Sequence, residues 1–195
     1  MAVPSPPSPS EKSELRAEGL GRRRDFARSL TPELRSDLEL KLARLVIPHL
    51  VTARVVAAYH PLKDEISPYA LVDQLGPGQR AALPWFAGRD ALMIWREAPA
   101  VEPSPWGVFQ PAETAEALVP DIVIVPLVFA DRQGTRIGHG KGHYDRALAN
   151  LREGGEVFTI GIGWESQISD DPLPADPWDQ PLDAIATPKE WIACR

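Results

Sequence analysis

The apolar run DIVIVPLVF at 121–129 constrains the fold of this chain more than any other segment. A strand with one face in water alternates apolar and polar residues, whereas this run is apolar at nearly every position and rich in β-branched side chains. Such runs are typical of strands in parallel sheets that helices cover on both faces. We therefore expect residues 121–129 to form a strand at the centre of a parallel sheet.

The segments on either side of this run alternate between helical and strand patterns. Thr31 and Pro32 supply the N-cap and the first position of the best-defined helix, in which leucines recur at helical spacing. We expect helices at 11–30, 31–48, 67–76 and 143–152, and strands at 54–59, 80–84, 92–97, 157–162 and near Ile185. Strand–helix–strand units of this kind predict an α/β fold of three layers, α/β/α, around a central, mostly parallel sheet.

The two ends of the chain differ in composition from its middle. Residues 1–10, MAVPSPPSPS, have too few apolar side chains to offset the entropy of ordering, so they predict a disordered Pro/Ser tail. The remaining residues, 11–195, are enough for one hydrophobic core and predict a single domain. In the first helix, Gly19 and Gly21 each weaken helix formation by up to about 1 kcal/mol.

Charge and cysteine content limit the possible partners and compartment. The formal charge is −6, which argues against charge-driven binding to nucleic acid. The longest apolar run contains Pro126 and is too short to cross a bilayer, and residues 1–10 lack the apolar centre of a signal peptide. Cys194 is the only cysteine, so the chain cannot form an internal disulfide. We expect a cytoplasmic monomer with no nucleic-acid or membrane partner.

The segment after the central strand, ADRQGTRIGHGKGHYDR at 130–146, has the composition of an anion-binding loop. Three of its glycines alternate with other residues, which permits positive φ values and a close approach of the backbone to a ligand. Their amides and the N-terminus of the next helix suit a phosphate group. The spacing is neither that of a P-loop nor that of a dinucleotide-binding turn. From residue types alone, a glycine-rich turn without function remains the alternative.

Charged side chains of the same loop suit a phosphorylated ligand with a metal ion. Lys141 and Arg136 can neutralise phosphate oxygens, and Asp145 can hold Mg²⁺ through one carboxylate oxygen. The loop thus predicts a site that binds a phosphate group together with Mg²⁺.

The segment PLVFADRQGTRIGHGKGHYDRAL resembles the most specific motif of the 5-formyltetrahydrofolate cyclo-ligase family. That motif has a strand ending in proline, an acidic-x-x-Gly turn, and then Arg-aliphatic-Gly-x-Gly-x-Gly-x-Tyr-Asp. Similar segments occur along the chain after residue 10: Lys12 with Leu15 and Arg16, YHPLKDEIS, LPW, SPWGVFQP and PWDQPLDAIATP. The resemblance covers nearly the whole chain outside its first ten residues.

The resemblance implies both a fold and a reaction. The fold would be Rossmann-like, of the NagB/RpiA/CoA transferase-like type. The reaction would convert 5-formyltetrahydrofolate to 5,10-methenyltetrahydrofolate with ATP and Mg²⁺, and would release ADP and phosphate. The formyl oxygen would be phosphorylated first, after which a neighbouring folate nitrogen would close the ring.

The resemblance also implies roles for individual residues. The catalytic residues would be Arg136, Lys141 and Tyr144. ATP would be bound by Lys12, Arg16, Arg136, Gly138, His139, Gly140, Lys141, Gly142, His143 and Tyr144. The folate would be bound by His60, Glu65, Trp106, His139, Gly140, Lys141, Gly142 and His143, and Mg²⁺ by Asp145 and Asp179. Without the motif, these residues fit equally well an exposed helix face, turns and core packing.

The chain departs from the family at two positions of the loop. His139 and His143 stand where the family often has bulky aromatic residues. A histidine keeps a planar ring and adds a group that titrates near neutral pH. We therefore predict that activity falls below about pH 6.5, the ordinary histidine pKa, because of His143.

Two other functions remain open at the level of the sequence. A sugar-phosphate isomerase or acyl transferase on a related scaffold would need a base and a phosphosugar pocket, but no Mg·ATP. A folate- or nucleotide-binding protein without catalytic activity would share the fold, because fold alone does not establish activity. The intact Lys141, Tyr144 and Asp145 argue against the second of these.

Overall fold

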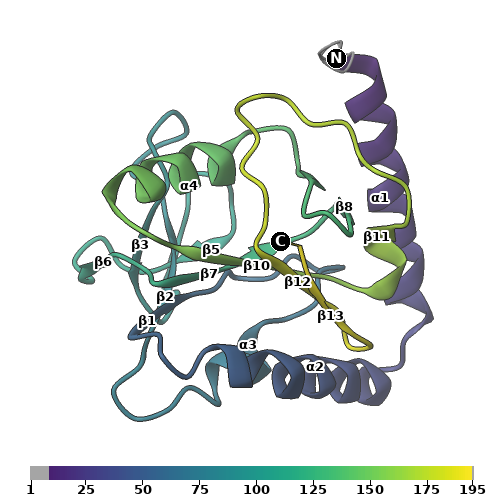
Figure 1. Ribbon diagram of the computed structural model, residues 1–195. Coiled ribbons are helices and arrows are strands. Elements are labelled where there is room, and N and C mark those ends of the chain that lie inside the picture. The colour runs from purple at the N-terminus through teal and green to yellow at the C-terminus, as the bar shows by residue number, and fades with distance from the viewer. Residues whose placement is uncertain (1–8, 195) are drawn as a thin grey trace.

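The apolar run at 121–129 forms strand β7, Ile122–Pro126, in the centre of an eight-stranded sheet (Figure 1). Ile122 and Ile124 belong to the core cluster on one face of this sheet, and Val123 and Val125 belong to the cluster on the other. Both faces of β7 are therefore buried, as its composition predicts.

The central sheet has the strand order β13-β12-β10-β7-β1-β2-β3-β6 in the computed structural model, which describes residues 9–194. The inner strands β12, β10, β7, β1 and β2 run parallel, whereas β13, β3 and β6 are antiparallel to their neighbours. The bounds of the strands around β7 are β1 Val55–Ala57, β2 Arg80–Trp85, β3 Ile94–Glu97, β6 Ala117–Leu118, β10 Phe158–Ile162, β12 Ala184–Ala186 and β13 Trp191–Ala193. The mostly parallel sheet is confirmed, and β6 and β13 are edge strands that the sequence pattern did not predict.

Helices cover both faces of the sheet, which confirms the three layers (Figure 1). Helix α4, His143–Gly154, packs on one face, and helices α2, Pro32–Val46, and α3, Tyr69–Val72, pack on the other. Helix α1, Pro9–Ser29, stands at the side of the sheet. Two short 3-10 turns complete the helical elements, η1 Ile47–His49 and η2 Glu165–Gln167.

The ends of the first two helices test the sequence analysis directly. Thr31 caps α2, because its hydroxyl accepts a hydrogen bond from the Leu34 amide at 3.2 Å, as predicted. Helix α1 begins at Pro9, so the predicted tail 1–10 extends too far at its C-terminal end. The rest of that predicted tail lies outside the described residues.

The predicted strand 121–129 is wrong at its C-terminal end. Proline has no amide hydrogen for a sheet ladder, and β7 stops at Pro126. The chain then enters a second sheet of three strands, in which β8, Phe129–Asp131, lies between β9 and β11, which span Arg136–Ile137 and Ile168–Ser169. A separate hairpin pairs β4, Glu102–Pro103, with β5, Phe109–Gln110.

The turn between β8 and β9 orders part of the segment that was predicted to be a loop. One carboxylate oxygen of Asp131 accepts hydrogen bonds from the amides of Gln133 and Thr135, at 3.0 and 2.9 Å. Gly134 in this turn has a φ of +94°, a conformation that glycine adopts readily. The segment that leads into the glycine-rich loop is therefore a tight hairpin.

Helix α1 lies directly against β8 and the residues before it. A Cβ atom on Gly19 would lie 2.7 Å from the Cβ of Phe129 and 2.7 Å from the carbonyl oxygen of Val128. No side chain fits in that space, so the glycine that weakens the helix also allows its close approach.

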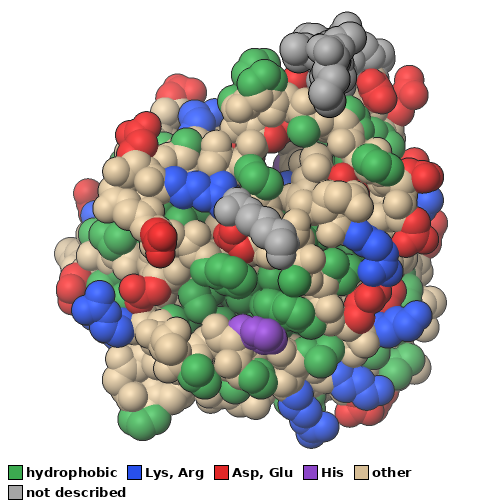
Figure 2. Space-filling model, in the orientation of Figure 1, with side chains coloured by type: hydrophobic (Ala, Val, Ile, Leu, Met, Phe, Trp, Pro, Cys, Tyr) green, Lys and Arg blue, Asp and Glu red, His purple; other side chains and the backbone are tan. Residues whose placement is uncertain are grey.

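Figure 2 shows one face of the molecule, with apolar side chains gathered over β10, β12 and β13 and charged side chains of both signs around them. This face carries no broad basic surface, in agreement with the net charge of −6. Among residues 9–194, no helix combines the length and the apolar composition that a membrane span requires.

Candidate active site

A cavity of about 790 Å³ opens at the carboxyl ends of the parallel strands. Residues that end or follow β1, β2 and β7 contribute to its lining, namely Tyr59, Pro84 and Pro126. In open α/β sheets, ligands bind at this edge. Every residue that the sequence analysis assigned to a site lines this one cavity: Lys12, Arg16, His60, Glu65, Trp106, Arg136, Gly138, His139, Gly140, Lys141, Gly142, His143, Tyr144, Asp145 and Asp179.

The glycine-rich loop passes along one side of this cavity and ends at the N-terminus of α4. Gly140 and Gly142 have φ values of +81° and +63°, whereas Gly138 does not have a positive φ, so the prediction holds for two of these glycines. Gly142 precedes α4, and no side chain among residues 9–194 caps that helix end. The first amides of α4 are thus available to an anion.

Two cations of α1, Arg16 and Lys12, also line the cavity. The Nε of Arg16 donates a hydrogen bond to the carbonyl of Gly138 at 2.7 Å, which attaches the helix to the loop. Lys12 contacts the carboxylates of Asp176, at 2.7 Å, and of Asp179. Burial opposes the charge of Lys12, but the hydrogen bonds to these carboxylates outweigh it and raise the pKa of Lys12.

Arg136 holds Asp145 in place rather than standing free in the cavity. Its Nη2 lies 2.6 Å from Oδ1 of Asp145, and its Nη1 donates to the carbonyl of Gln180. The amide of Gln180 also donates to Oδ1 of Asp145, at 3.2 Å. Arg136 therefore joins the glycine-rich loop, helix α4 and the segment at 176–181, in addition to the positive charge that it adds.

The residues predicted to bind Mg²⁺ have a suitable donor set. Within residues 9–194, the hydrogen bonds of Asp145 use Oδ1 and those of Asp179 use Oδ2, so each carboxylate keeps a second oxygen for a ligand. The same described residues contain no cluster of three or more His, Cys, Asp or Glu side chains that could hold a metal ion. Mg²⁺ commonly binds one or two carboxylates together with phosphate oxygens and water. The pair thus fits an ion that arrives with a phosphate ligand.

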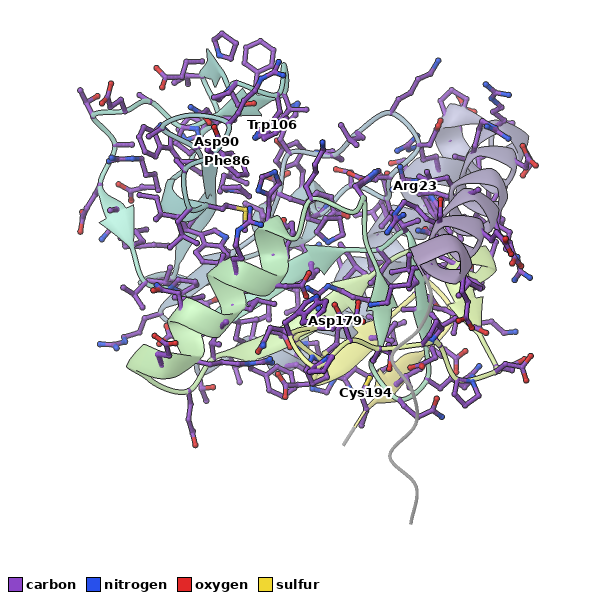
Figure 3. All side chains as sticks on the ribbon, turned by 90° about the horizontal axis from the view of Figure 1, so that it is seen from above. Arg23, Phe86, Asp90, Trp106, Asp179 and Cys194 are labelled. Carbon is purple, nitrogen blue, oxygen red and sulfur yellow. The ribbon has the colours of Figure 1, made fainter. Side chains whose placement is uncertain are left out.

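An aromatic group forms another wall of the cavity. The ring of His143 lies 5.0 Å from the rings of both Phe86 and Trp106, and the Nζ of Lys141 lies 5.8 Å from the centre of the Trp106 ring. Figure 3 shows Phe86 and Trp106 side by side. His143 therefore provides the planar ring that the resemblance predicts at this position.

The surroundings of His143 favour its neutral form. A guanidinium nitrogen of Arg146 lies 3.2 Å from Nδ1 of His143 and can only donate, so this imidazole nitrogen accepts. Burial, followed by the nearby charges of Arg146 and Lys141, lowers the pKa of His143. The loss of activity that the sequence predicts near pH 6.5 is therefore expected at lower pH, because these neighbours favour the neutral imidazole.

Glu65 also lines the cavity, and it lies in a network of donors. Its Oε1 contacts Arg23 at 2.9 Å and lies 3.6 Å from Nε2 of His139, and its Oε2 accepts a hydrogen bond from the Leu62 amide at 2.8 Å. Burial opposes ionisation, but the His139, Arg23 and Leu62 contacts together lower the pKa of Glu65. The carboxylate is thus ionised in a nearly dry environment.

His60 and Tyr144 complete the predicted set. The Nδ1 of His60 lies 2.6 Å from the hydroxyl of Tyr69, which fixes the orientation of the imidazole. Burial, with a smaller contribution from the charge of Glu65, raises the pKa of Tyr144 far above its usual range. Tyr144 is consequently a hydrogen-bond donor at neutral pH.

Several residues that line the cavity or support its lining were not predicted. Asp176, which holds Lys12, lies in the same proline-rich segment as Asp179 and carries no motif of its own. Arg23 belongs to a run of arginines at 22–24 in which only the fold distinguishes the buried member. Phe86 directly follows the LPW segment, the one sequence signal that was available for it.

Comparisons with known proteins point to the same family as the loop motif. Residues 8–188 match the 5-formyltetrahydrofolate cyclo-ligase family. The chain is 32% identical to the 5-formyltetrahydrofolate cyclo-ligase of Mycolicibacterium smegmatis, over 95% of this chain and 97% of the relative. It is 29% identical to the enzyme of that name from Escherichia coli, over 86% of this chain and 98% of the relative.

Solved structures of similar proteins share the fold. The 5,10-methenyltetrahydrofolate synthetase of Aquifex aeolicus superimposes with a TM-score of 0.71 at 28% identity, covering 94% of this chain and 93% of that protein. The synthetase of Mycoplasma pneumoniae gives a TM-score of 0.69 at 25% identity, covering 91% and 99%. Because the family match spans most of the chain and a relative at 32% identity is covered almost completely, the chain belongs to the 5-formyltetrahydrofolate cyclo-ligase family.

Proposed function

We propose that this enzyme converts 5-formyltetrahydrofolate to 5,10-methenyltetrahydrofolate, using ATP and Mg²⁺ and releasing ADP and phosphate. The observation that carries the proposal is the single cavity at the carboxyl ends of the strands, which contains every residue that the family motif marks. The proposal includes a single catalytic domain at 11–195 that acts as a monomer in the cytoplasm.

The glycine-rich loop is suited to the triphosphate of ATP. The backbone at Gly140 and Gly142 and the first amides of α4 offer hydrogen-bond donors, and Lys141 and Arg16 offer positive charge close to them. In phosphoryl transfer, the protein contributes mainly by positioning the reactants and neutralising charge. These groups would hold the terminal phosphate against the formyl oxygen.

Asp145 and Asp179 would hold the magnesium ion, each through its second carboxylate oxygen. Mg²⁺ bound there would neutralise negative charge on the phosphate oxygens. Arg136 and Lys12 hold the two carboxylates in place, because each forms an ion pair with one of them.

The reaction has two chemical steps. In the first, the formyl oxygen attacks the terminal phosphorus and ADP departs. In the second, the neighbouring folate nitrogen attacks the activated carbon and loses its proton, a carbon–nitrogen bond forms, and phosphate leaves with the former formyl oxygen. The protonated hydroxyl of Tyr144 can donate a hydrogen bond to the oxygens of the transferred group, on which negative charge develops.

Other parts of the cavity lining are suited to the folate. The rings of Trp106 and His143 provide flat apolar surfaces for an aromatic substrate, and the ionised Glu65 provides an acceptor for its ring N–H groups. His60 also lines the cavity.

The appearance of the product tests the proposal. Purified protein would be incubated with 5-formyltetrahydrofolate, ATP and Mg²⁺, and the near-ultraviolet absorbance of the methenyl product followed over time. We expect a signal that requires all three components. Product formation that is independent of ATP, or the absence of product with an intact fold, would contradict the proposed reaction.

A further inference from the structure

Arg23 is a buried cation that contacts Glu65, a residue of the cavity lining. We infer that Arg23 is a positioning residue, which holds the carboxylate of Glu65 ionised and directed into the cavity. The inference rests on the proposed function, in which Glu65 contacts the folate.

The contact between Arg23 and Glu65 is short and almost fully buried. The Nη1 of Arg23 lies 2.9 Å from Oε1 of Glu65, and the two side chains are 6% and 5% exposed. The same nitrogen lies 3.3 Å from the carbonyl oxygen of Leu127, just after β7, which anchors the guanidinium to the central sheet. Figure 3 shows Arg23 on α1, away from Phe86 and Trp106. Arg23 thus acts on Glu65 and does not line the cavity itself.

This pair is poorly suited to a purely stabilising role. The Nε of Arg23 is buried without a hydrogen-bond partner among the described residues, and an unsatisfied buried donor destabilises the fold. Buried ion pairs are in general no more stabilising than well-packed apolar residues of similar volume. A cation kept here at such a cost is better explained by what it does to the cavity carboxylate.

The sequence of α1 explains how Arg23 reaches this position. Gly19 lies one helical turn earlier and allows the helix to approach β8 so closely that a Cβ atom would not fit. Arg22 is next to Arg23 in sequence but is half-exposed and pairs with Glu18 on the same helix. The helix thus buries one arginine of the run and exposes its neighbour.

The groups around Glu65 differ in whether they are charged at neutral pH and in whether that charge depends on pH. His139 of the glycine-rich loop is charged only when protonated, and burial raises the pKa of both Tyr59, after β1, and Tyr144 of α4, so these phenols are neutral. From α2, Arg35 donates to the backbone carbonyl of Glu65 rather than to its carboxylate. A guanidinium remains charged at every pH in which a protein is folded. Arg23 is therefore the permanent positive charge in hydrogen-bond contact with this carboxylate.

Removal of the Arg23 charge should change both the affinity for folate and its pH dependence. In Arg23→Gln, burial is no longer opposed by the guanidinium, so Glu65 takes up a proton at higher pH. We expect the acid limb of kcat/KM for 5-formyltetrahydrofolate to move to higher pH. We also expect the KM for the folate to rise by roughly 10- to 100-fold, the scale on which loss of an orienting partner acts. The KM for ATP should stay within about twofold, because the proposed function assigns Glu65 to the folate and not to ATP.

Two further variants separate position from charge and from general stability. Arg23→Lys keeps the charge but not the fork of donors, so it should raise the folate KM several-fold and leave the acid limb in place. Arg22→Gln removes the exposed neighbour, with its ion pair to Glu18 and its contact with the Phe129 ring, and should leave the KM and the pH profile unchanged. Thermal midpoints measured for all variants identify any that fail to fold.

The outcomes distinguish this inference from the proposed reaction. A wild-type enzyme that forms no methenyl product contradicts the proposed function itself. An active wild type with a folded Arg23→Gln variant that keeps the wild-type folate KM and acid limb contradicts the positioning role, even if that variant melts at a lower temperature. Should Arg23→Gln not fold, Arg23→Lys decides the matter, and an unchanged folate KM in that variant overturns the inference.

Discussion

Lys141 differs from the other cations of the cavity in its surroundings. Lys12 and Arg136 each contact carboxylates, and Arg16 is bonded to a backbone carbonyl. Within the part of the chain that the structure describes, Lys141 is exposed and forms no ion pair; its ammonium lies over the ring of Trp106. A cation without a carboxylate partner retains its full attraction for an incoming phosphate.

Replacement of Lys141 by alanine should abolish most of the turnover while the fold persists. Loss of one charged donor at a transferring phosphate commonly lowers kcat by about 10²–10³-fold. The rate of methenyl product formation and the thermal midpoint would be compared with those of Lys41→Ala, which removes an exposed lysine of α2. Near-normal activity of the Lys141 variant would contradict the assignment of the loop to ATP.

The pH dependence of kcat/KM should show that the pKa of His143 lies below the ordinary histidine value. Its lowered pKa means that less than half of the imidazole is protonated at pH 6.5, and that half-protonation is reached only at lower pH. We therefore expect any loss of kcat/KM that protonation of His143 causes to be centred below about pH 6.5, the ordinary histidine value, and to be absent in His143→Tyr. A loss centred at or above that value, present in wild type and absent in the tyrosine variant, would mean that the site does not lower this pKa.

The site could be predicted where residues sit in a motif and not where they only support it. Gly140, Lys141 and Asp145 were identified because the loop pattern is dense and specific. Arg23 and Asp176 were not, because nothing in a run of arginines or a proline-rich segment says which member is buried or which reaches across the fold.

At the scale of elements, the two glycines of helix α1 differ in the space that surrounds them. A Cβ atom on Gly19 would meet the backbone and side chain of the residues around β8 at 2.7 Å, whereas the nearest atom to one on Gly21 is a mobile nitrogen of Arg24 at 3.9 Å. Helix propensity favours alanine over glycine at both positions by about 1 kcal/mol. Packing therefore reverses the effect at one position only.

Gly19→Ala and Gly21→Ala should consequently change stability in opposite directions. We expect Gly19→Ala to lower the free energy of unfolding by about 1–3 kcal/mol, since overpacking forces the helix away from the sheet. Gly21→Ala should raise it by up to about 1 kcal/mol. Denaturant unfolding followed by circular dichroism measures both. Stabilisation by both substitutions would show that α1 does not pack as closely as described.

The elements that the sequence predicts well are those with a strong local pattern. Helix α2 has its cap and its leucine spacing, and β7 has its β-branched run. The short strands β6 and β13 pair only at the edges of the sheet, where their order depends on neighbours far away in sequence rather than on their own residues. The departure of the chain from the sheet after Pro126 was missed for a different reason, because the apolar run continues past the proline to Phe129.

At the scale of the whole molecule, the ligand site joins parts of the chain that are distant in sequence. Lys12 of α1 contacts Asp179, 167 residues later, and Arg136 contacts Asp145 and Gln180. A ligand bound between these segments favours the folded state over the unfolded chain. At 100 times the dissociation constant, this linkage amounts to about 2.7 kcal/mol.

Mg·ATP should therefore raise the thermal midpoint, and the increase should depend on Lys12. We expect a clear upward shift in wild type, a smaller one in Lys12→Ala, and the wild-type shift in Lys41→Ala, measured by differential scanning fluorimetry. Chelation of Mg²⁺ should reduce the shift in wild type. An equal shift in wild type and Lys12→Ala would place the nucleotide elsewhere.

The contact between Lys12 and Asp179 also determines how much of the chain must be synthesised before this part of the cavity can form. A ribosome makes α1 well before the carboxylate that its lysine contacts, which follows 167 residues later in the chain. Until then Lys12 lacks this contact, and no nascent fragment holds the complete lining of the cavity. A message interrupted before Asp179 would therefore yield a polypeptide with an incomplete cavity, however well its sheet had begun to assemble.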